Sequence, residues 1–110
     1  MHVAEAYELD EVLEELKAGD NWFLTFLSKK TMDVGILRLR PGEKDPQGPH
    51  ANDELYYVVR GSGFLRVEEE DLPVKPGSMV FVPAKKRHNF HGNEEEIVVL
   101  YFFAGSDEDI

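Results

Sequence analysis

The chain has 110 residues, of which 42% are hydrophobic and 31% charged, a composition typical of one globular domain over residues 1–110. Acidic residues outnumber basic ones 22 to 12, and the net charge of −10 would repel nucleic acid and anionic membranes, so neither is an expected partner. The chain has no cysteine, which excludes a disulfide, a thiol nucleophile and a thiolate site, so any metal must be held by nitrogen and oxygen atoms.

The N-terminal region predicts one short amphipathic helix over about 10–18. Asp10 is a candidate N-cap, and Gly19 is placed to end the helix. We expect the apolar face to cover the main sheet or to form a dimer contact. No basic segment followed by an apolar run opens the chain, so a cytoplasmic location is predicted. The apolar face consists of Leu9, Val12, Leu13 and Leu16.

From residue 22 onward, short apolar runs alternate with Gly, Pro, Asn and Asp, a pattern typical of an all-β sandwich or barrel. We predict a barrel over about 22–104 and an acidic tail over 105–110. The runs are "WFLTFLS", "MDVGILRLR", "ELYYVVRG", "GFLRVEEE", "GSMVFVPA", "RHNFHG" and "EIVVLYFFAG".

The histidines are the first candidates for chemistry. His2 lies near the terminus, where we expect no role. His50 is followed by Asn52 and Glu54 at intervals of two residues, and an extended backbone would point all three to one face. An imidazole, an amide oxygen and a carboxylate on one face begin a nitrogen and oxygen metal site. A surface loop with ordinary hydrogen bonds explains the same spacing, so a third strong ligand is needed.

His88 is the candidate for that third ligand. It enters a predicted strand after a turn, and the neighbouring Phe90 and Val82 indicate that the strand faces inward. His91 has the opposite parity and should face away unless a bulge intervenes. The alternative for His88 is a histidine that caps a strand beside the basic run at 85–87.

Two motifs occur in order along the chain, "HANDELYYVVRG" at 50–61 and "GSMVFVPAKKRHNFHGN" at 77–93. With these motifs the sequence resembles the cupins, a family of small antiparallel β-barrels marked by two histidine-bearing motifs. The resemblance covers about 33–104. It implies an all-β, antiparallel double-stranded β-helix, or jelly-roll barrel, here with one short N-terminal α-helix.

Carried over to this chain, the resemblance makes His50 the second histidine of the first motif, Glu54 its glutamate and His88 the histidine of the second motif. The first histidine would then fall at Gly48, which cannot bind a metal. If the alignment shifts by one ligand, His50 is the first histidine and Asn52 replaces the second. Either way, one of the four usual ligands is lost or weakened.

Two histidines and a carboxylate suit Fe(II), while Zn, Mn, Ni and Co accept the same ligands, so one divalent metal of open identity is expected. Gln47 and Asn52 are neutral oxygen donors for a weak fourth position. The second motif also departs from the family pattern, since Lys85 replaces a glycine and Gly92 stands where the family often has asparagine.

Small cupins enclose a pocket inside the barrel. Tyr56 and Val58 share the parity of Glu54 and should point inward, as Phe90 does beside His88. Tyr56 is a candidate to donate a hydrogen bond to a metal-bound ligand, and the alternative is an aromatic ring that fills the barrel. Such a pocket would suit a small, partly apolar molecule with an oxygen chelator. The expected core phenylalanines are Phe26, Phe81, Phe102 and Phe103.

The resemblance implies a metal-dependent small-molecule enzyme, with dioxygenase-like oxidoreductase chemistry foremost and isomerase or decarboxylase chemistry also known among cupins. Fold analogy does not choose among these reactions, and no general base stands out because Glu54 would bind the metal. The alternatives are a non-catalytic cupin that binds a metal or small ligand, and a cupin that has lost its metal. The apolar run at 96–105 and exposed sheet edges predict a homodimer.

Overall fold

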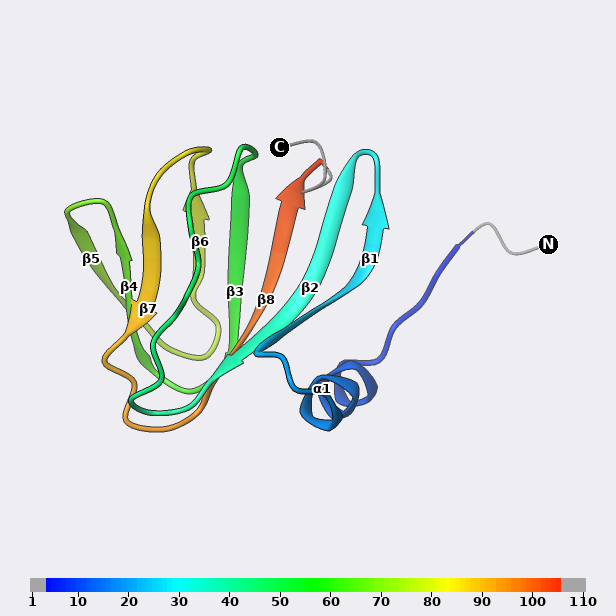
Figure 1. Cartoon of the computed structure of the whole chain (residues 1–110), viewed down its shortest axis with the longest axis horizontal. Helices are drawn as coiled ribbons and strands as arrows, with labels where there is room; N and C mark the ends of the chain where they lie inside the picture. Colours follow the sequence, from blue (N-terminus) through cyan, green and yellow to red (C-terminus); the bar gives the residue numbers. More distant parts are fainter. Residues whose placement is uncertain (1–3, 106–110) are drawn as a thin grey trace.

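The computed structural model describes residues 4–105, in which one helix precedes eight strands (Figure 1). His2 and residues 106–110 of the predicted acidic tail lie outside the described residues. No helix in this described part is both long and apolar enough to cross a membrane. The elements are α1 (Leu9–Ala18), β1 (Phe23–Lys29), β2 (Met32–Leu39), β3 (Glu54–Arg60), β4 (Gly63–Val67), β5 (Glu70–Val74), β6 (Met79–Val82), β7 (His88–His91) and β8 (Ile97–Ala104).

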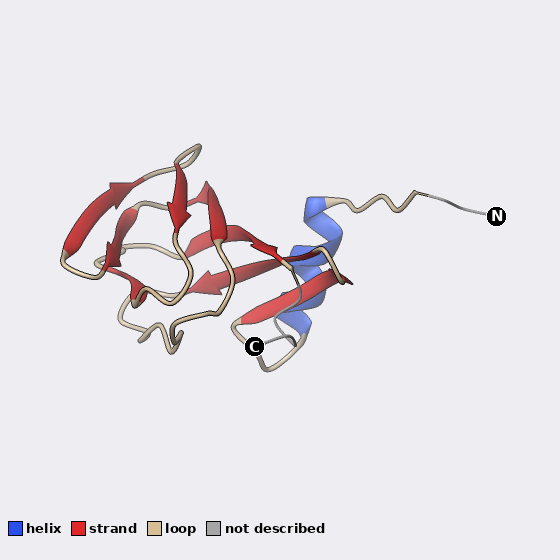
Figure 2. Ribbon diagram, turned by 90° about the horizontal axis from the view of Figure 1, so that it is seen from above, coloured by secondary structure: helices blue, strands red, loops and turns tan. Residues whose placement is uncertain are grey.

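The strands form two antiparallel sheets that face each other as a jelly-roll barrel (Figures 1 and 2). The larger sheet has the order β1-β2-β8-β3-β6 and the smaller one β5-β4-β7. The predicted fold class is therefore confirmed. β8 lies in the middle of the larger sheet, so the apolar run near the C-terminus is explained by burial inside the sheet and not by an exposed edge.

Cross-strand pairing fixes the row of side chains nearest one end of the barrel. Phe103 on β8 pairs with Asp33 on β2 and with Glu54 on β3, and Glu54 pairs in turn with Val82 on β6. All four residues are buried. Because side chains alternate along a strand, the inward parity predicted for Glu54 also applies to Tyr56, which is fully buried in the barrel core.

The helix covers the outer face of the larger sheet, as predicted. The predicted N-cap was wrong, since Glu8 holds that position and Asp10 lies inside the first turn. Glu8 makes no side-chain capping bond. The negative charges of the acidic groups in the first turn instead stabilise the positive end of the helix dipole. The buried face packs against Ile36 and Val98 and is formed by Val12, Leu13 and Leu16.

The strand β5 and the exposure of Phe81 differ from the predictions. β5 has the sequence EDLPV, whose acidic start and proline hid it from a search for apolar runs, and both features suit an edge strand. Phe81 is 58% exposed because β6 turns Val80 and Val82 inward and Phe81 outward. Phe103 is buried as expected, whereas Phe26 and Phe102 are only partly buried.

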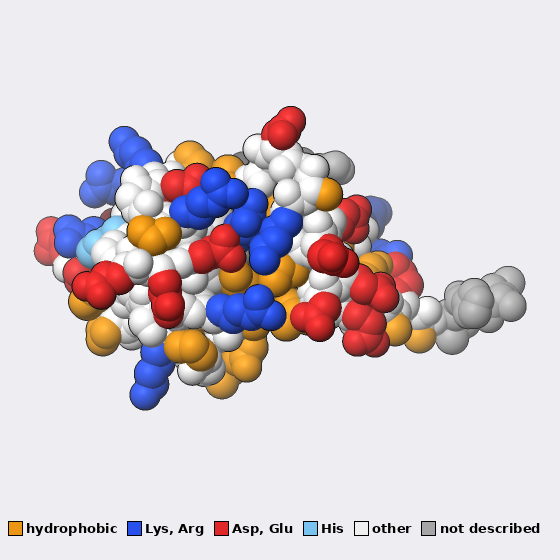
Figure 3. Space-filling view, turned by 90° about the horizontal axis from the view of Figure 1, so that it is seen from below, with side chains coloured by type: hydrophobic (Ala, Val, Ile, Leu, Met, Phe, Trp, Pro, Cys, Tyr) orange, Lys and Arg blue, Asp and Glu red, His pale blue; other side chains and the backbone are white. Residues whose placement is uncertain are grey.

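Acidic and basic side chains are interspersed on the face of the molecule shown in Figure 3, with apolar groups visible between them. Several basic side chains adjoin near the centre of that face, and acidic side chains border them. The net charge of −10 is carried by many separate acidic groups over the chain.

The turn before β7 holds Lys85 at φ 68°, in the left-handed region that favours glycine. This is the residue that replaces a glycine of the cupin motif, so the turn keeps its conformation without the usual residue. The Lys85 backbone N–H donates a 2.6 Å hydrogen bond to the His50 carbonyl, which ties this turn to the loop before β3.

Lys85→Gly should raise the free energy of unfolding by about 0.5–1 kcal/mol, because relief of the left-handed strain, roughly 1–2 kcal/mol, exceeds the entropy cost of glycine, roughly 0.5–1 kcal/mol. Denaturant unfolding of the metal-free protein measures this change. Lys86→Gly is the control, since Lys86 has no positive φ and its replacement should only destabilise the fold. A Lys85→Gly protein less stable than the wild type would contradict this reading of the turn.

Candidate metal centre

Three side chains from separate segments meet at one end of the barrel. Glu54 is the first residue of β3 and His88 the first residue of β7, so the two sheets each contribute one ligand, and His50 comes from the loop before β3. One ligand atom from each of the three lies within 4.8 Å of the others. The structure thus brings together the three residues that the sequence predicted as strong ligands.

The buried polar atoms of this cluster fit a metal ion. His88 Nε2 lies 3.2 Å from Glu54 Oε1, but these atoms are not oriented as a hydrogen bond, and both Glu54 oxygens and His88 Nε2 are buried without hydrogen-bond partners. A buried carboxylate without partners is costly, and a divalent cation would satisfy it together with the imidazole nitrogens. The donor set of His50, Glu54 and His88 therefore suits one divalent metal.

The His88 ring is held in the orientation that a metal ligand needs. Its Nδ1 lies 2.9 Å from the Lys86 carbonyl, which can only accept, so Nδ1 carries the proton and Nε2 presents its lone pair to Glu54 and His50. Burial lowers the pKa of His88, but the adjacent Glu54, the Lys86 carbonyl and the charge of Asp45 outweigh it and leave the pKa above its ordinary value. A proton therefore competes with a metal for this nitrogen.

Asn52 does not share the position predicted for it. The chain bends at 51–52 before β3 begins, so the alternation of an extended strand does not reach back from Glu54 to Asn52. The Asn52 amide instead lies beside Gly105, just after β8, and it does not line the cavity that adjoins the metal cluster. Gly48 does line that cavity with His50, which favours the alignment in which Gly48 replaces the missing histidine.

A buried carboxylate that the sequence analysis missed holds this loop in place. Asp45 Oδ2 accepts hydrogen bonds from the Phe90 backbone N–H at 2.8 Å and from Gln47 Nε2 at 2.9 Å, and Oδ1 accepts from the Gln47 backbone N–H at 3.1 Å. Gln47 Oε1 in turn accepts a 2.6 Å hydrogen bond from the Tyr56 hydroxyl. In the sequence, only the turn-forming segment "DPQG" indicates a structural role for Asp45. No neighbouring residue predicts its hydrogen bond to the Phe90 backbone on β7.

Asp45→Asn should lower metal affinity by about 10–100-fold, the usual effect of disturbing groups that support metal ligands. The amide would place an N–H₂ group opposite donors that now need an acceptor, so the loop that carries His50 would lose its attachment to β7. Competition with a chromophoric chelator measures the affinity. Asp71→Asn is the matched control, because Asp71 is a partly exposed partner of His91 on the small sheet. Equal losses in both variants would contradict a specific role for Asp45.

Tyr56 lies behind the cluster. Its ring centroid is 5.9 Å from that of His88 and 5.0 Å from that of Phe90. Burial, followed by the charge of Glu54, raises the pKa of Tyr56 well above its ordinary value, so the hydroxyl stays protonated and acts as a donor to Gln47. Its predicted contribution to chemistry, a hydrogen bond donated to a metal-bound ligand, stays a prediction.

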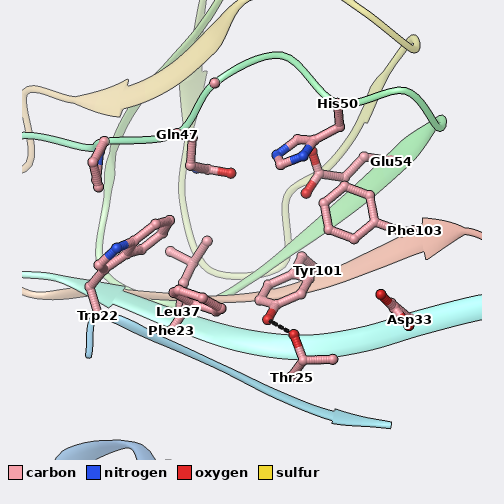
Figure 4. A pocket seen from close by; sticks show the side chains of 12 residues that line it. Trp22, Phe23, Thr25, Asp33, Leu37, Gln47, His50, Glu54, Tyr101 and Phe103 are labelled. Atoms are coloured by element: carbon pink, nitrogen blue, oxygen red, sulfur yellow. Dashed lines mark hydrogen bonds between the residues drawn. The ribbon is translucent and has the colours of Figure 1, made fainter. Parts of the chain in front are cut away.

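A cavity of about 220 Å³ adjoins the cluster, between the β1–β2 side of the large sheet and the loop before β3 (Figure 4). His50 and Glu54 line it, whereas His88 does not. On the sheet side, the Thr25 and Tyr101 hydroxyls lie 2.6 Å apart, and a side chain at Gly35 would overlap the Tyr101 ring. The carboxylate of Asp33, another residue that the sequence analysis missed, also faces this cavity.

Two facing antiparallel sheets with two histidines and a glutamate at one end define a jelly-roll protein with a candidate metal centre. The family model for the cupin domain matches residues 35–104. The chain therefore belongs to the cupin family, as the sequence motifs indicated.

Among curated proteins, the chain is 42% identical over 99 residues to an uncharacterized protein of Streptomyces coelicolor, covering 90% of this chain and 94% of that protein. It is 32% identical over 99 residues to an acireductone dioxygenase of Sulfurihydrogenibium, covering 84% of this chain but only 52% of that protein. Among solved structures, it resembles an RmlC-like cupin with a double-stranded β-helix fold from Methanocaldococcus jannaschii, with a TM-score of 0.77 at 15% identity over 99% of this chain and 97% of that one. This last likeness concerns the fold alone.

Proposed function

We propose that this protein binds one divalent metal through His50, Glu54 and His88 and uses it to act on a small oxygen-chelating molecule in the adjoining cavity. The observation that carries the proposal is the buried Glu54 carboxylate, whose two oxygens lack hydrogen bonds although it lies beside His88. A fold keeps such a group at a cost in stability, and a site that needs a negatively charged metal ligand explains the cost.

The metal and the residues around the cavity would have separate roles. The metal, when bound, would supply Lewis-acid activation of a chelated oxygen and, with a redox-active ion, electron transfer. His50 and Glu54 face the cavity, so a chelator there would reach the metal from that side. Gly48 lines the same wall, and among residues 4–105 no heavy atom beyond its two chain neighbours lies within 4 Å of a Cβ built on it, so this position leaves room for a ligand where a fourth protein ligand is missing.

Dioxygenase-like chemistry is the foremost reaction class that we propose. Its support is the likeness to the acireductone dioxygenase, although this chain spans about half of that protein's length. Fe, Zn, Mn, Ni and Co all suit the three ligands, and isomerase or decarboxylase chemistry uses the same Lewis acid. A non-catalytic cupin that binds a metal or small ligand is the second candidate, favoured by the open position at Gly48.

Metal content and oxygen uptake together test this proposal. The protein should take up close to one metal per chain after reconstitution with Fe(II), Zn(II), Mn(II), Ni(II) or Co(II) and removal of excess ion, as measured by elemental analysis. Oxygen uptake by the Fe(II) form is then measured with enediols, diketones, catechols and flavonols. Uptake with one of these compounds distinguishes a dioxygenase from a protein that only binds its ligand. Chains that retain no metal under any of these conditions would overturn both candidates that depend on it.

We also propose a homodimer formed through the outer face of β3 and β6. Met79 is 68% exposed, Phe81 58% and Leu55 39%, and Leu55 pairs directly with Phe81 across these strands. Apolar side chains that adjoin on a sheet face and its edge strand favour association. Light scattering should give twice the mass of the chain, and Phe81→Lys should shift it to the monomer mass. An unchanged mass in the variant would contradict this interface.

A further inference from the structure

The carboxylate of Asp33 lies in the wall of the metal-side cavity. We infer that Asp33 selects the substrate by charge: the cavity takes a small chelator whose non-chelating end is uncharged or cationic and donates a hydrogen bond, and it rejects ends that carry carboxylate or phosphate. This inference rests on the proposed function, since it concerns the molecule that the metal would chelate.

The position of Asp33 relative to the metal ligands is set by the sheet. Asp33 and Glu54 are both paired with Phe103, one on each side of β8, so they lie in one row two strand spacings apart. Two spacings amount to about 10 Å. A ligand with the length of one aromatic ring and a short substituent would therefore reach from the metal to the Asp33 carboxylate.

The Asp33 side chain is fixed in place as an acceptor. The residue is 5% exposed, and the Ser28 hydroxyl donates a 2.6 Å hydrogen bond to Oδ1. The neighbouring Thr25 and Tyr101 hydroxyls, 2.6 Å apart, add polar groups to the same side of the cavity. A buried carboxylate held in this way favours a ligand ammonium or hydroxyl and repels a second anion.

No lysine or arginine is found among the described residues that line the cavity. A divalent metal carries two positive charges, and two carboxylate residues, Glu54 and Asp33, line this cavity. The net charge of −10 adds a weaker repulsion of anions from the whole molecule. The negative charge at the site and the negative net charge of the chain thus both disfavour an anionic ligand.

The rest of the cavity limits the size and polarity of the ligand. Its volume of about 220 Å³ is below the roughly 300–1,000 Å³ of pockets for drug-sized molecules. Trp22, Phe23, Leu37 and Pro46 form an apolar wall. A single ring or a short alkyl chain is small and apolar enough for this cavity. A phosphorylated sugar would be repelled by the negative charge of the site and is too polar for the apolar wall.

Three catechols with the same chelating group and different substituents test the inference. The full chain loaded with redox-inert Zn(II) is titrated without oxygen with dopamine, 4-methylcatechol and 3,4-dihydroxybenzoate in a calorimeter. The cationic and neutral catechols should bind at least about tenfold more tightly than the carboxylate, the scale of one like-charge contact near a protein surface. In Asp33→Asn this difference should shrink to about twofold or less.

Asp10→Asn removes the same charge from the exposed helix surface and should leave the preference unchanged, which separates a local effect from that of net charge. Equal affinities for the three catechols in the wild type would overturn the charge selection by Asp33 while leaving the metal proposal standing. Tighter binding of the carboxylate would do the same. A Zn(II)-loaded protein that binds none of the catechols would overturn the proposed function and this inference together.

Discussion

His88→Ala is expected to lose its metal, with an affinity lower than that of the wild type by more than about 100-fold, the upper range for groups that only support a ligand. The variant removes Nε2, one of the atoms that point into the cluster with Glu54 and His50. The remaining histidine and carboxylate would hold a divalent ion no better than many pairs on protein surfaces. Elemental analysis of the reconstituted protein and competition with a chelator measure the loss.

His91→Ala is the matched control for this variant. His91 ends the same strand, β7, but faces outward, where its Nε2 lies 2.6 Å from Asp71 and its ring stacks on Phe64. Its removal should leave metal content and affinity unchanged. If both histidine variants kept their metal, the cluster at His88 would not be the binding site.

Glu54→Leu is expected to abolish metal binding and at the same time to raise the free energy of unfolding of the metal-free protein by about 1–3 kcal/mol. The gain is expected at a pH where His88 is neutral, because leucine then removes a buried carboxylate that lacks hydrogen bonds in the absence of metal and fills a similar volume with apolar atoms. Glu54 is only 2% exposed, so its carboxylate has little contact with bulk solvent in the wild type. Denaturant unfolding in the presence of a chelator measures the stability.

Glu54→Gln separates the two effects of this variant. Glutamine keeps the size and polarity of the side chain and removes its charge, so metal affinity should fall as in Glu54→Leu while stability should rise less. A Glu54→Leu protein that is less stable than the metal-free wild type would contradict the view that the buried Glu54 carboxylate lowers the stability of the metal-free fold and is retained as a metal ligand.

Two of the three candidate ligands stand where local rules are strong, whereas His50 lies in a loop and was predicted through the resemblance of its motif to that of the cupins. His88 and Glu54 begin strands whose alternation of inward and outward side chains is regular, so their parity with Phe90 and Tyr56 could be inferred from sequence alone. The second motif then linked two sites 34 residues apart that no local rule would have joined. The same alternation identified His91 as outward-facing.

The remaining features depend on contacts between distant segments. Asp45 and Asp33 are buried because Phe90 and Phe103 lie beside them in the folded chain, which neither residue's neighbours in sequence reveal. Phe81 is exposed because it faces outward from β6, whose other side carries Val80 and Val82 toward the barrel interior. Asn52 departs from its predicted face because a bend interrupts the extended backbone before the strand begins.

The ligands of the candidate centre come from two sheets and a loop, so a bound ion would act on the chain as a cross-link. While bound, it would join position 50 to position 54 and both to position 88. By mass action, an ion at 100 times its dissociation constant would add about 2.7 kcal/mol to the stability of the fold. The stability of the folded barrel would therefore rise and fall with the concentration of free metal around it.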